Sequence, residues 1–229
     1  MNNKFFISID FDGTVTPIDI TNAIIKRFAM PGWERAERLW EDGTIGSREC
    51  LATQMSLIAT PMEDLLTYAR NYSVHDSFGP FLKFLRKSDI PHAIISDGFS
   101  VFIEQILSDA GIGGVPIYAN RLTYEQGLLK TIFLHTNAKC SSATCKCETA
   151  ERAGGTLPVV HIGDGESDFC LAEKAAYVFS KRKLTSHCRK NFIPHSTFDS
   201  FSHVEQKLRF FMAQTAVSEQ WTKNRSKSA

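Results

Sequence analysis

Short apolar segments alternate with amphipathic segments along most of this 229-residue chain, and this alternation limits the folds open to it. The apolar segments have the length of buried strands, while apolar residues recur at helical spacing in the segments between them. The predicted strands are 4–10, 91–96, 117–122, 157–162 and 177–179, and the predicted helices among them are 78–87, 101–110 and 147–153. Strands that alternate with helices favour a parallel sheet covered on both faces. We therefore predict an α/β fold with a doubly wound, mainly parallel, Rossmann-like sheet.

The segment 16–75 interrupts this alternation with a purely helical pattern. Ile20 and Ile24 recur at helical spacing, and so do Leu51 and Met55 further along. Proline and glycine residues divide the segment into short pieces. We predict a small insertion of four helices directly after the first strand, and one α/β core formed by residues 1–15 and 76–229.

The composition argues against several classes of partner. The formal net charge is +1, which creates no chain-wide field for nucleic acid or an anionic membrane. No stretch approaches the roughly 20 apolar residues that span a bilayer, and the basic stretch 181–190 lacks interleaved aromatic residues. The first apolar run ends at Asp10 and Asp12 without a signal-peptide cleavage site. We expect a cytoplasmic protein that binds neither nucleic acid nor membrane.

The six cysteines are interpreted as reduced thiols, as expected for a chain without an export signal. Cys140, Cys145 and Cys147 follow His135 and invite a zinc interpretation. Their C-x₄-C-x-C spacing fits no common structural zinc site well, because those sites use paired C-x₂₋₄-C elements. Metal binding by these cysteines stays open from the sequence, and so does the oligomeric state.

Polar motifs follow three of the predicted strands. They are Asp10-Phe11-Asp12-Gly13-Thr14, Ser96-Asp97-Gly98 and Gly163-Asp164-Gly165-Glu166-Ser167-Asp168. In an open parallel sheet ligands bind beyond the carboxyl ends of the strands, so the motifs are expected to meet in one crevice. Carboxylates held so close repel one another unless a cation joins them. An oxygen-rich site without His or Cys in its motifs favours Mg²⁺ over zinc.

A crevice of this kind can transfer a phosphoryl group. One carboxylate beside Mg²⁺ can attack phosphorus, and a second one, two residues on, can protonate the leaving alcohol and later deprotonate water. The phosphoryl oxygens need hydrogen-bond donors. Candidates for binding the phosphate or substrate are the loop N–H groups around Asp12, Gly13 and Gly98, the hydroxyl of Ser96, the adjoining Asp97, and a lysine.

Asp10-x-Asp12-Gly13-Thr14, Ser96, a downstream lysine and Gly163-Asp164-Gly165-x-x-Asp168 resemble, in that order, the four motifs of the haloacid dehalogenase superfamily of phosphohydrolases. Together they span nearly the whole chain. The helical insertion resembles the subgroup with a four-helix cap, which includes phosphoserine phosphatases and the methionine-salvage 2-hydroxy-3-keto-5-methylthiopentenyl-1-phosphate phosphatases. The run 118–122 is similar to both kinds of enzyme, whereas 140–147 and 179–198 are more similar to the methionine-salvage enzymes.

This resemblance implies a role for each matching residue. Asp10 would be the nucleophile and a Mg²⁺ ligand. Asp12 would be the general acid and base, and would offer its backbone carbonyl to the metal. Ser96 would hold the phosphoryl group, Asp164 would bind Mg²⁺, and Asp168 would support the metal ligands.

The third-motif lysine and the cap residues are defined less closely by the resemblance. Lys146 is preferred to Lys139 because it directly precedes the predicted helix at 147–153. Phosphoserine phosphatases bind the amino-acid head with a cap Glu and a cap Arg, and the matching positions here hold Asp19 and Gln54. Loss of the arginine removes a bidentate contact to a carboxylate, so phosphoserine ranks second among the expected substrates.

We therefore expect a Mg²⁺-dependent phosphomonoester hydrolase that acts on a small phosphorylated metabolite through an aspartyl-phosphate. The first choice of substrate is a methionine-salvage-like phosphorylated ketone, followed by phosphoserine and then by phosphocholine or phosphoethanolamine. The sequence does not separate hydrolysis from phosphoryl transfer to another alcohol. A module that binds a phosphorylated ligand without turnover is the alternative from another class. The presence of both Asp10 and Asp12 argues against it, because binding alone needs no acid and base.

Overall fold

A single sheet organises the chain in the computed structural model, which describes residues 5–226. Within that range the sheet has seven strands in the order β4-β3-β2-β1-β5-β6-β7. All neighbouring strands run parallel except β3 and β4, which form an antiparallel hairpin. The strands are β1 (Phe6–Ile9), β2 (His92–Phe99), β3 (Ile117–Glu125), β4 (Leu128–Ile132), β5 (Val159–Gly163), β6 (Tyr177–Ser180) and β7 (His195–Thr197).

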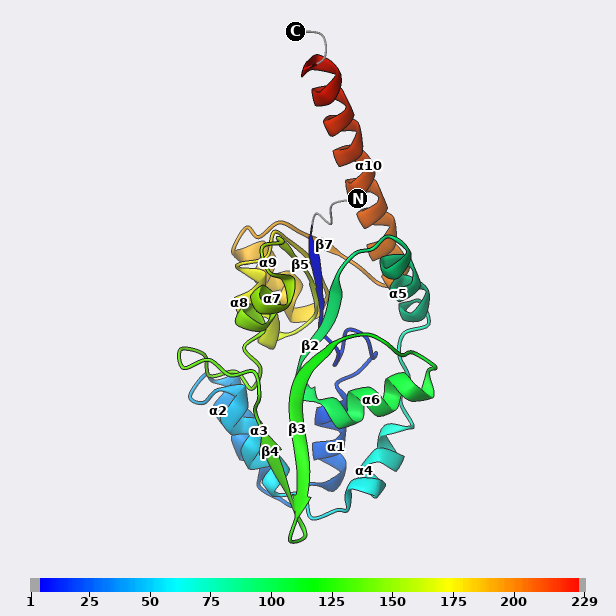
Figure 1. Cartoon of the computed structure of the whole chain (residues 1–229). Helices are drawn as coiled ribbons and strands as arrows, with labels where there is room; N and C mark the ends of the chain where they lie inside the picture. The colour runs from blue at the N-terminus through cyan, green and yellow to red at the C-terminus, as the bar shows by residue number, and fades with distance from the viewer. Residues whose placement is uncertain (1–4, 227–229) are drawn as a thin grey trace.

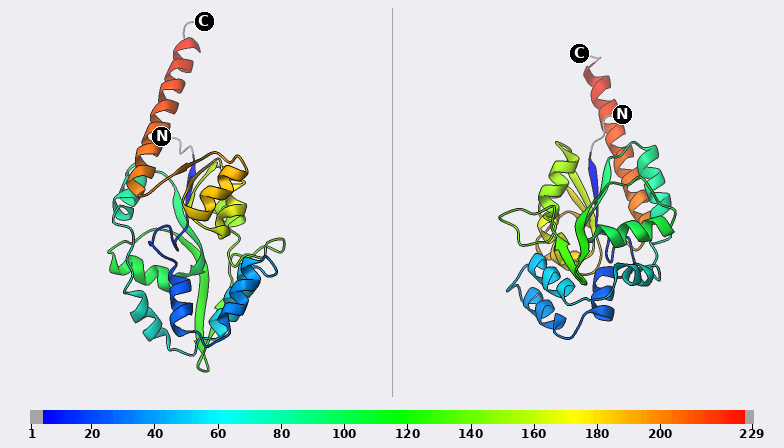
Figure 2. Two further views of the ribbon diagram at one scale, coloured as in Figure 1. Left: turned by 180° about the vertical axis from the view of Figure 1, so that it is seen from behind. Right: turned by 60° about the horizontal axis from the view of Figure 1, so that its bottom comes forward.

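Helices cover both faces of the sheet, which confirms the predicted α/β class (Figures 1 and 2). One face carries α5 (Phe78–Lys87), α6 (Ser100–Asp109) and the long α10 (Phe201–Ser226). The other carries α7 (Lys146–Gly154), the short α8 (Phe169–Ala172) and α9 (Arg182–Lys190), and a 3₁₀ turn at Glu166–Asp168 precedes α8. No helix in the described range has the length and apolar character needed to cross a membrane.

Four helices separate β1 from the next core element, as the sequence predicts for the insertion. They are α1 (Ile20–Phe28), α2 (Trp33–Glu41), α3 (Ser47–Ser56) and α4 (Met62–Ala69). They lie beyond the carboxyl end of β1, beside the β3–β4 hairpin (Figure 1). The division into a core of 1–15 and 76–229 and a cap of 16–75 stays a prediction, and its residues 1–4 and 227–229 lie outside the described residues.

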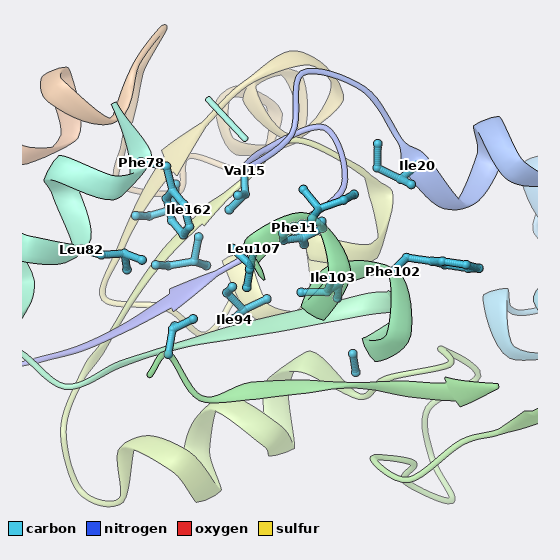
Figure 3. Packing of buried hydrophobic residues seen from close by; sticks show 14 of the residues in the cluster. Phe11, Val15, Ile20, Phe78, Leu82, Ile94, Phe102, Ile103, Leu107 and Ile162 are labelled. Carbon is cyan, nitrogen blue, oxygen red and sulfur yellow. The ribbon is translucent and has the colours of Figure 1, made fainter. Parts of the chain in front are cut away.

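Buried aliphatic and aromatic side chains fill the space between the sheet and its helices. Every residue of β1 is buried, which is the pattern of a central parallel strand covered on both faces. Figure 3 shows side chains of the strands and of the loop after β1 packed against side chains of α5 and α6, among them Phe11, Ile94, Ile162, Leu82, Ile103 and Leu107. This packing fixes the end of β1, from which the first motif emerges.

The structure differs from the sequence prediction at three places in the sheet. The edge strand β7 is missing from the prediction because it has three residues, all of them polar and none of them buried. β2 continues through Ser96-Asp97-Gly98 to Phe99, where the sequence predicts a turn, and its pairing with β3 shifts between Ile95 and Phe99. Within this irregular stretch the N–H of Gly98 donates a hydrogen bond to Oγ of Ser96 at 2.9 Å. The hairpin strand β4 is missing from the prediction because most of its residues are exposed and it carries no buried apolar run.

Phe201 at the start of α10 joins this helix to the core, and its removal tests that packing. Its buried ring lies 4.9 Å from the ring of Phe78 and 5.3 Å from that of Phe81, measured between centroids. Phe201→Ala is expected to lower the free energy of unfolding by about 3–5 kcal/mol in urea titrations, because it leaves a cavity. The matched control is Phe210→Ala on the same helix, where the side chain is 57% exposed and the expected loss is below about 0.5 kcal/mol. Equal losses for the two variants would contradict this account of the packing.

Candidate active site

The three polar motifs meet in one cavity at the carboxyl ends of β1, β2 and β5. β1 pairs in parallel with β2 on one side and with β5 on the other, so the residues that follow these strands become neighbours. The cavity has a volume of about 220 Å³. Its floor includes Asp10, Asp12, Ser96, Gly98 and Asp164, and side chains of α1, α2 and α3 form its roof. The spatial prediction made from the strand ends is therefore met.

Lys146 occupies the centre of the polar network beneath the cavity. Its ammonium group lies 2.6 Å from Oδ1 of Asp10 and 2.5 Å from Oδ1 of Asp168, and all three side chains are buried. Burial opposes the charge on Lys146, but the two carboxylates outweigh it and raise the pKa of the lysine. Lys139, the alternative from the sequence, is exposed and joins the site through no contact of its side chain that the structure describes.

Burial and nearby carboxylates disfavour the ionised form of Asp10. Burial raises the pKa of Asp10, Asp168 raises it further, and Lys146 opposes both effects. Asp168 has the opposite balance, because Lys146 and His161 outweigh burial and hold its pKa below the ordinary value. The second oxygen of Asp168 accepts hydrogen bonds from the backbone N–H groups of Asp164 and Gly165, both at 3.0 Å. Asp168 thus holds the loop that carries Asp164.

Asp12 lies in a different environment from Asp10. It accepts hydrogen bonds from the N–H of Ile20 at 2.9 Å and from the hydroxyl of Thr21 at 3.2 Å. Burial raises the pKa of Asp12 to about 8, and the charge of Asp19 contributes in the same direction. This shift of the pKa of Asp12 favours its protonated form, in which the carboxyl group can donate a proton. A Cβ at Gly98 would lie 2.5 Å from Oδ2 of Asp12, so a larger residue at this position would displace the carboxyl group of Asp12.

Asp164 faces the first motif across the cavity. Its Oδ1 lies 3.4 Å from the hydroxyl of Thr14, and its Oδ2 accepts a hydrogen bond from Nη1 of Arg182 at 2.9 Å. Burial and the charge of Asp168 raise the pKa of Asp164, whereas Arg182 lowers it. Gly13 has a φ of 75°, and a Cβ there would lie 2.4 Å from Oδ2 of Asp164. Both the backbone conformation and the close approach therefore require glycine at this position.

The second motif connects the floor of the cavity to the cap and to the loop before α7. Ser96 is buried, and its Oγ accepts the N–H of Gly98, which leaves the hydroxyl proton free to be donated. Asp97 accepts hydrogen bonds from the hydroxyl of Ser47 on α3 at 2.5 Å and from the N–H of Thr144 at 2.8 Å. The side chain of Asp97, which the sequence predicts to bind substrate, therefore links α3 to the loop before α7.

The two cap residues singled out from the sequence both line the cavity. Asp19 is exposed, is the N-cap of α1 and accepts the N–H of Asn22 at 2.7 Å. Gln54 is 1% exposed and donates a hydrogen bond to Oε2 of Glu37 at 2.7 Å. Contact of Asp19 or Gln54 with a substrate stays a prediction.

The donor set fits a hard divalent cation. Ligand oxygens of Asp10, Asp164 and Asp168 all lie within 4.8 Å of one another. They form the only group of His, Cys, Asp and Glu side chains within residues 5–226 that is arranged to hold a metal. Oxygen ligands from carboxylates suit Mg²⁺ rather than zinc. Since burial raises the pKa of both Asp10 and Asp164, a cation between them would favour their ionised forms.

The cysteines that invited a zinc interpretation are free thiols. None of the six cysteines forms a disulfide, and Cys145 and Cys147 are buried. These two pack in a small apolar cluster with Phe6, Ile95 and Ala150. Their environment in the structure is that of packing residues.

Several residues of the site are absent from the sequence prediction. His161 lies in the middle of β5 with Nε2 3.0 Å from Oδ1 of Asp168 and Nδ1 3.3 Å from Oγ of Ser8. Ser8 and His161 stand opposite each other in paired strands. Two polar residues in buried strands require partners, so this pair could have been noticed. Arg182 lies in a basic stretch with no distinguishing pattern, and nothing in the sequence marks it.

A family model described as haloacid dehalogenase-like hydrolase matches residues 7–173. A protein of Geobacillus thermodenitrificans named 2-hydroxy-3-keto-5-methylthiopentenyl-1-phosphate phosphatase is 28% identical over 218 residues, which cover 91% of this chain and 97% of that protein. A protein of the same name from Brevibacillus brevis is 27% identical over 215 residues, with the same coverage.

Solved structures with the same fold include two of phosphoserine phosphatase. One, a phospho-aspartyl intermediate analogue, has a TM-score of 0.67 at 19% identity and covers 90% of this chain and 99% of that one. The other, a substrate-bound complex, has a TM-score of 0.68 at 17% identity with the same coverage. At these identities the structural similarity establishes the fold alone.

Replacing Lys146 tests the network beneath the cavity. Lys146→Met removes the charge that lies between Asp10 and Asp168 and leaves two buried carboxylates without it. In metal-free buffer at neutral pH the free energy of unfolding is expected to fall by about 3–5 kcal/mol in urea titrations. The control Lys139→Met changes an exposed side chain and is expected to stay within about 0.5 kcal/mol of the original protein. A Lys146→Met variant as stable as this control would contradict the network.

Proposed function

The chain belongs to the haloacid dehalogenase-like hydrolase family and is a phosphatase, and we propose that it hydrolyses a small phosphomonoester through an aspartyl-phosphate on Asp10. The observation that carries this proposal is the meeting of Asp10, Asp12, Ser96 and Asp164 in one cavity beneath a helical roof. This convergence supports the roles of nucleophile for Asp10, general acid for Asp12 and hydrogen-bond donor to the phosphoryl group for Ser96.

In the first half of the reaction, a carboxylate oxygen of Asp10 attacks phosphorus and the bond from phosphorus to the leaving alcohol breaks. Asp12 donates its proton to the leaving oxygen, which suits a carboxyl group whose pKa burial raises to about 8. The hydroxyl of Ser96 donates a hydrogen bond to a phosphoryl oxygen. Lys146 orients Asp10 through the 2.6 Å contact with Oδ1 and offsets part of the developing negative charge.

In the second half, water attacks phosphorus and the bond between phosphorus and Asp10 breaks. Asp12, now ionised, takes the proton of the attacking water, so that each group returns to its starting state. Inorganic phosphate leaves the cavity. The helices of the cap exclude other water while the phosphoryl group is transferred, and they must open to exchange the product.

The residues suited to hold Mg²⁺ are Asp10, Asp164 and the backbone carbonyl of Asp12, with Asp168 supporting them through the loop of Asp164. Bound there, Mg²⁺ would supply positive charge that offsets repulsion between Asp10 and the phosphoryl oxygens. Within this arrangement Arg182, which contacts Asp164 at 2.9 Å, keeps that carboxylate aimed at the first motif.

We place a phosphorylated ketone like that named for the methionine-salvage relatives first among substrates, because those relatives align with 91% of this chain. By sequence resemblance phosphoserine comes next, followed by phosphocholine and phosphoethanolamine. The cavity supports the place of the ketone ahead of phosphoserine, since Gln54 stands where a carboxylate-binding arginine would be expected and hydrogen-bonds Glu37. We also propose that the protein acts in the cytoplasm on soluble substrates, without nucleic acid.

Replacing the proposed nucleophile tests the reaction class. Asp10→Asn is expected to lower kcat by at least about three orders of magnitude, because an amide cannot form the acyl-phosphate. Phosphate release from a panel of phosphorylated metabolites at fixed Mg²⁺ measures this loss. The matched control is Asp109→Asn on α6, which removes a carboxylate outside the cavity and is expected to retain full activity. Near-normal turnover by folded Asp10→Asn would contradict the assignment.

Metal removal provides a separate test with two readouts. EDTA is expected to abolish phosphate release, and added Mg²⁺ to restore it. Mg²⁺ should also raise the melting temperature in the absence of substrate, because a ligand that binds only the folded state stabilises it. Asp164→Asn should lose this thermal shift, whereas Asp109→Asn should keep it. Undiminished activity in EDTA, or an equal shift in both variants, would argue against the metal site.

A further inference from the structure

The roof of the cavity contains a carboxylate that neither the catalytic residues nor the Mg²⁺ ligands account for. Glu37 lies on α2 and lines the cavity opposite the floor that holds Asp10. Its Oε2 accepts a hydrogen bond from Nε2 of Gln54 at 2.7 Å and lies 3.9 Å from Sγ of Cys50. Its Oε1 has a single long contact, 3.4 Å from Nδ2 of Asn22. All these neighbours are neutral, and among the described residues no Lys or Arg forms an ion pair with Glu37.

A carboxylate held in this way can still accept a hydrogen bond from a ligand. An ionised carboxylate has about four acceptor positions, and the contacts described leave capacity mainly at Oε1. Gln54 is almost fully buried and fixes the side chain of Glu37 in position. A carboxylate preorganised by neutral donors and without an ion-pair partner, since Lys183 of the cavity wall pairs with Glu166, is suited to accept a hydrogen bond from a hydroxyl or ammonium group.

The charge of the cavity wall disfavours a carboxylate on the substrate. Asp19, Glu37 and Glu166 line the cavity, and Lys183 is the cation among the lining residues. Lys183 already pairs with Glu166 at 2.9 Å. A substrate carboxylate would thus lose water without gaining a cation, which is costly in a confined site. Apolar surface is available instead on Ile25, Trp40 and Leu51.

We propose that Glu37 is the specificity-determining residue of this site, and that it selects phosphomonoesters whose leaving alcohol bears a hydroxyl or ammonium donor and no carboxylate. The donor pairs with Oε1 of Glu37, and the carbon chain of the alcohol packs against Ile25, Trp40 and Leu51. This inference rests on the proposed function, because it concerns the substrate of the same hydrolytic site. The hydroxylated, phosphorylated ketone placed first above belongs to this class.

Two matched pairs of substrates test the selection directly. Phosphoserine is phosphoethanolamine with a carboxylate added, and 3-phosphoglycerate carries a carboxylate where glycerol 1-phosphate carries a hydroxymethyl group. The member without a carboxylate is expected to have a kcat/KM at least about tenfold higher in each pair. The favoured member of the first pair carries an ammonium donor, and that of the second pair carries hydroxyl donors. Comparing the kcat/KM values of phosphoethanolamine and glycerol 1-phosphate therefore shows from which kind of donor Glu37 accepts a hydrogen bond.

Three variants assign the selection to Glu37. Glu37→Gln removes the charge and is expected to reduce each ratio to within about threefold, mainly by raising KM for the favoured member. Glu37→Asp keeps the charge but shortens its reach, so it should lower kcat/KM for the favoured members while still rejecting the carboxylates. The control is Glu41→Gln on the same helix, an exposed residue outside the cavity, which should leave both ratios unchanged.

Turnover of p-nitrophenyl phosphate, which bears no such donor, and the melting temperature verify that each variant is folded and competent. The inference is overturned if the original protein prefers the carboxylated members, or if folded Glu37→Gln and Glu37→Asp both keep the original ratios. Absence of Mg²⁺-dependent turnover on every substrate would instead overturn the proposed function, and this inference with it. If the Glu37 variants keep Mg²⁺-dependent turnover and the substrate ratios of the original protein, the inference alone is overturned and the proposed function stands.

Discussion

The site depends on one buried cation, the ammonium group of Lys146 between the carboxylates of Asp10 and Asp168. Two carboxylates cannot remain ionised in a buried pocket without opposing charge. Lys146 supplies part of it from below, where α7 begins, and leaves the upper side of Asp10 facing the cavity. The same contacts tie β1, α7 and the loop after β5 together. Stability and the proposed chemistry therefore rest on the same group.

The parallel sheet brings these distant residues together. The ends of β1, β2 and β5 meet because these strands are neighbours, and the four helices inserted after β1 close the space above them. The floor of the cavity is suited to a phosphoryl group and a divalent cation, and the roof to the leaving alcohol. This separation allows the substrate to change through α1, α2 and α3 while the floor keeps its chemistry.

The strand ends are the part of the site that sequence reasoning predicts well. An apolar run that stops at Asp or Ser fixes where a side chain will lie once the sheet is parallel, which is why Asp10, Ser96 and Asp164 were placed together. Contacts between loops carry no such signal. Arg182 reaches Asp164 from the start of α9, and Ser47 reaches Asp97 from the cap, through geometry that appears only in the folded chain.

In the fold, too, elements with a hydrophobic pattern are predictable from the sequence, and elements without one are not. The alternation of strands and helices follows from hydrophobic periodicity, whereas β4 is a largely exposed edge strand without it. The turn before β4 is nevertheless marked by Gln126 and Gly127, which both have positive φ angles, as a tight hairpin requires. Glu37 is absent from the site residues predicted from the sequence for a further reason. Its partners Asn22, Cys50 and Gln54 come from two other helices, so their convergence depends on how the cap packs.

The most direct test of the central claim is a crystal structure determined with Mg²⁺ and beryllofluoride, an analogue of a phosphoryl group. The account predicts beryllium bonded to a carboxylate oxygen of Asp10, with a fluorine near the hydroxyl of Ser96 and Mg²⁺ bound by Asp10 and Asp164. Beryllofluoride on another residue, or Mg²⁺ bound away from Asp10 and Asp164, would contradict it.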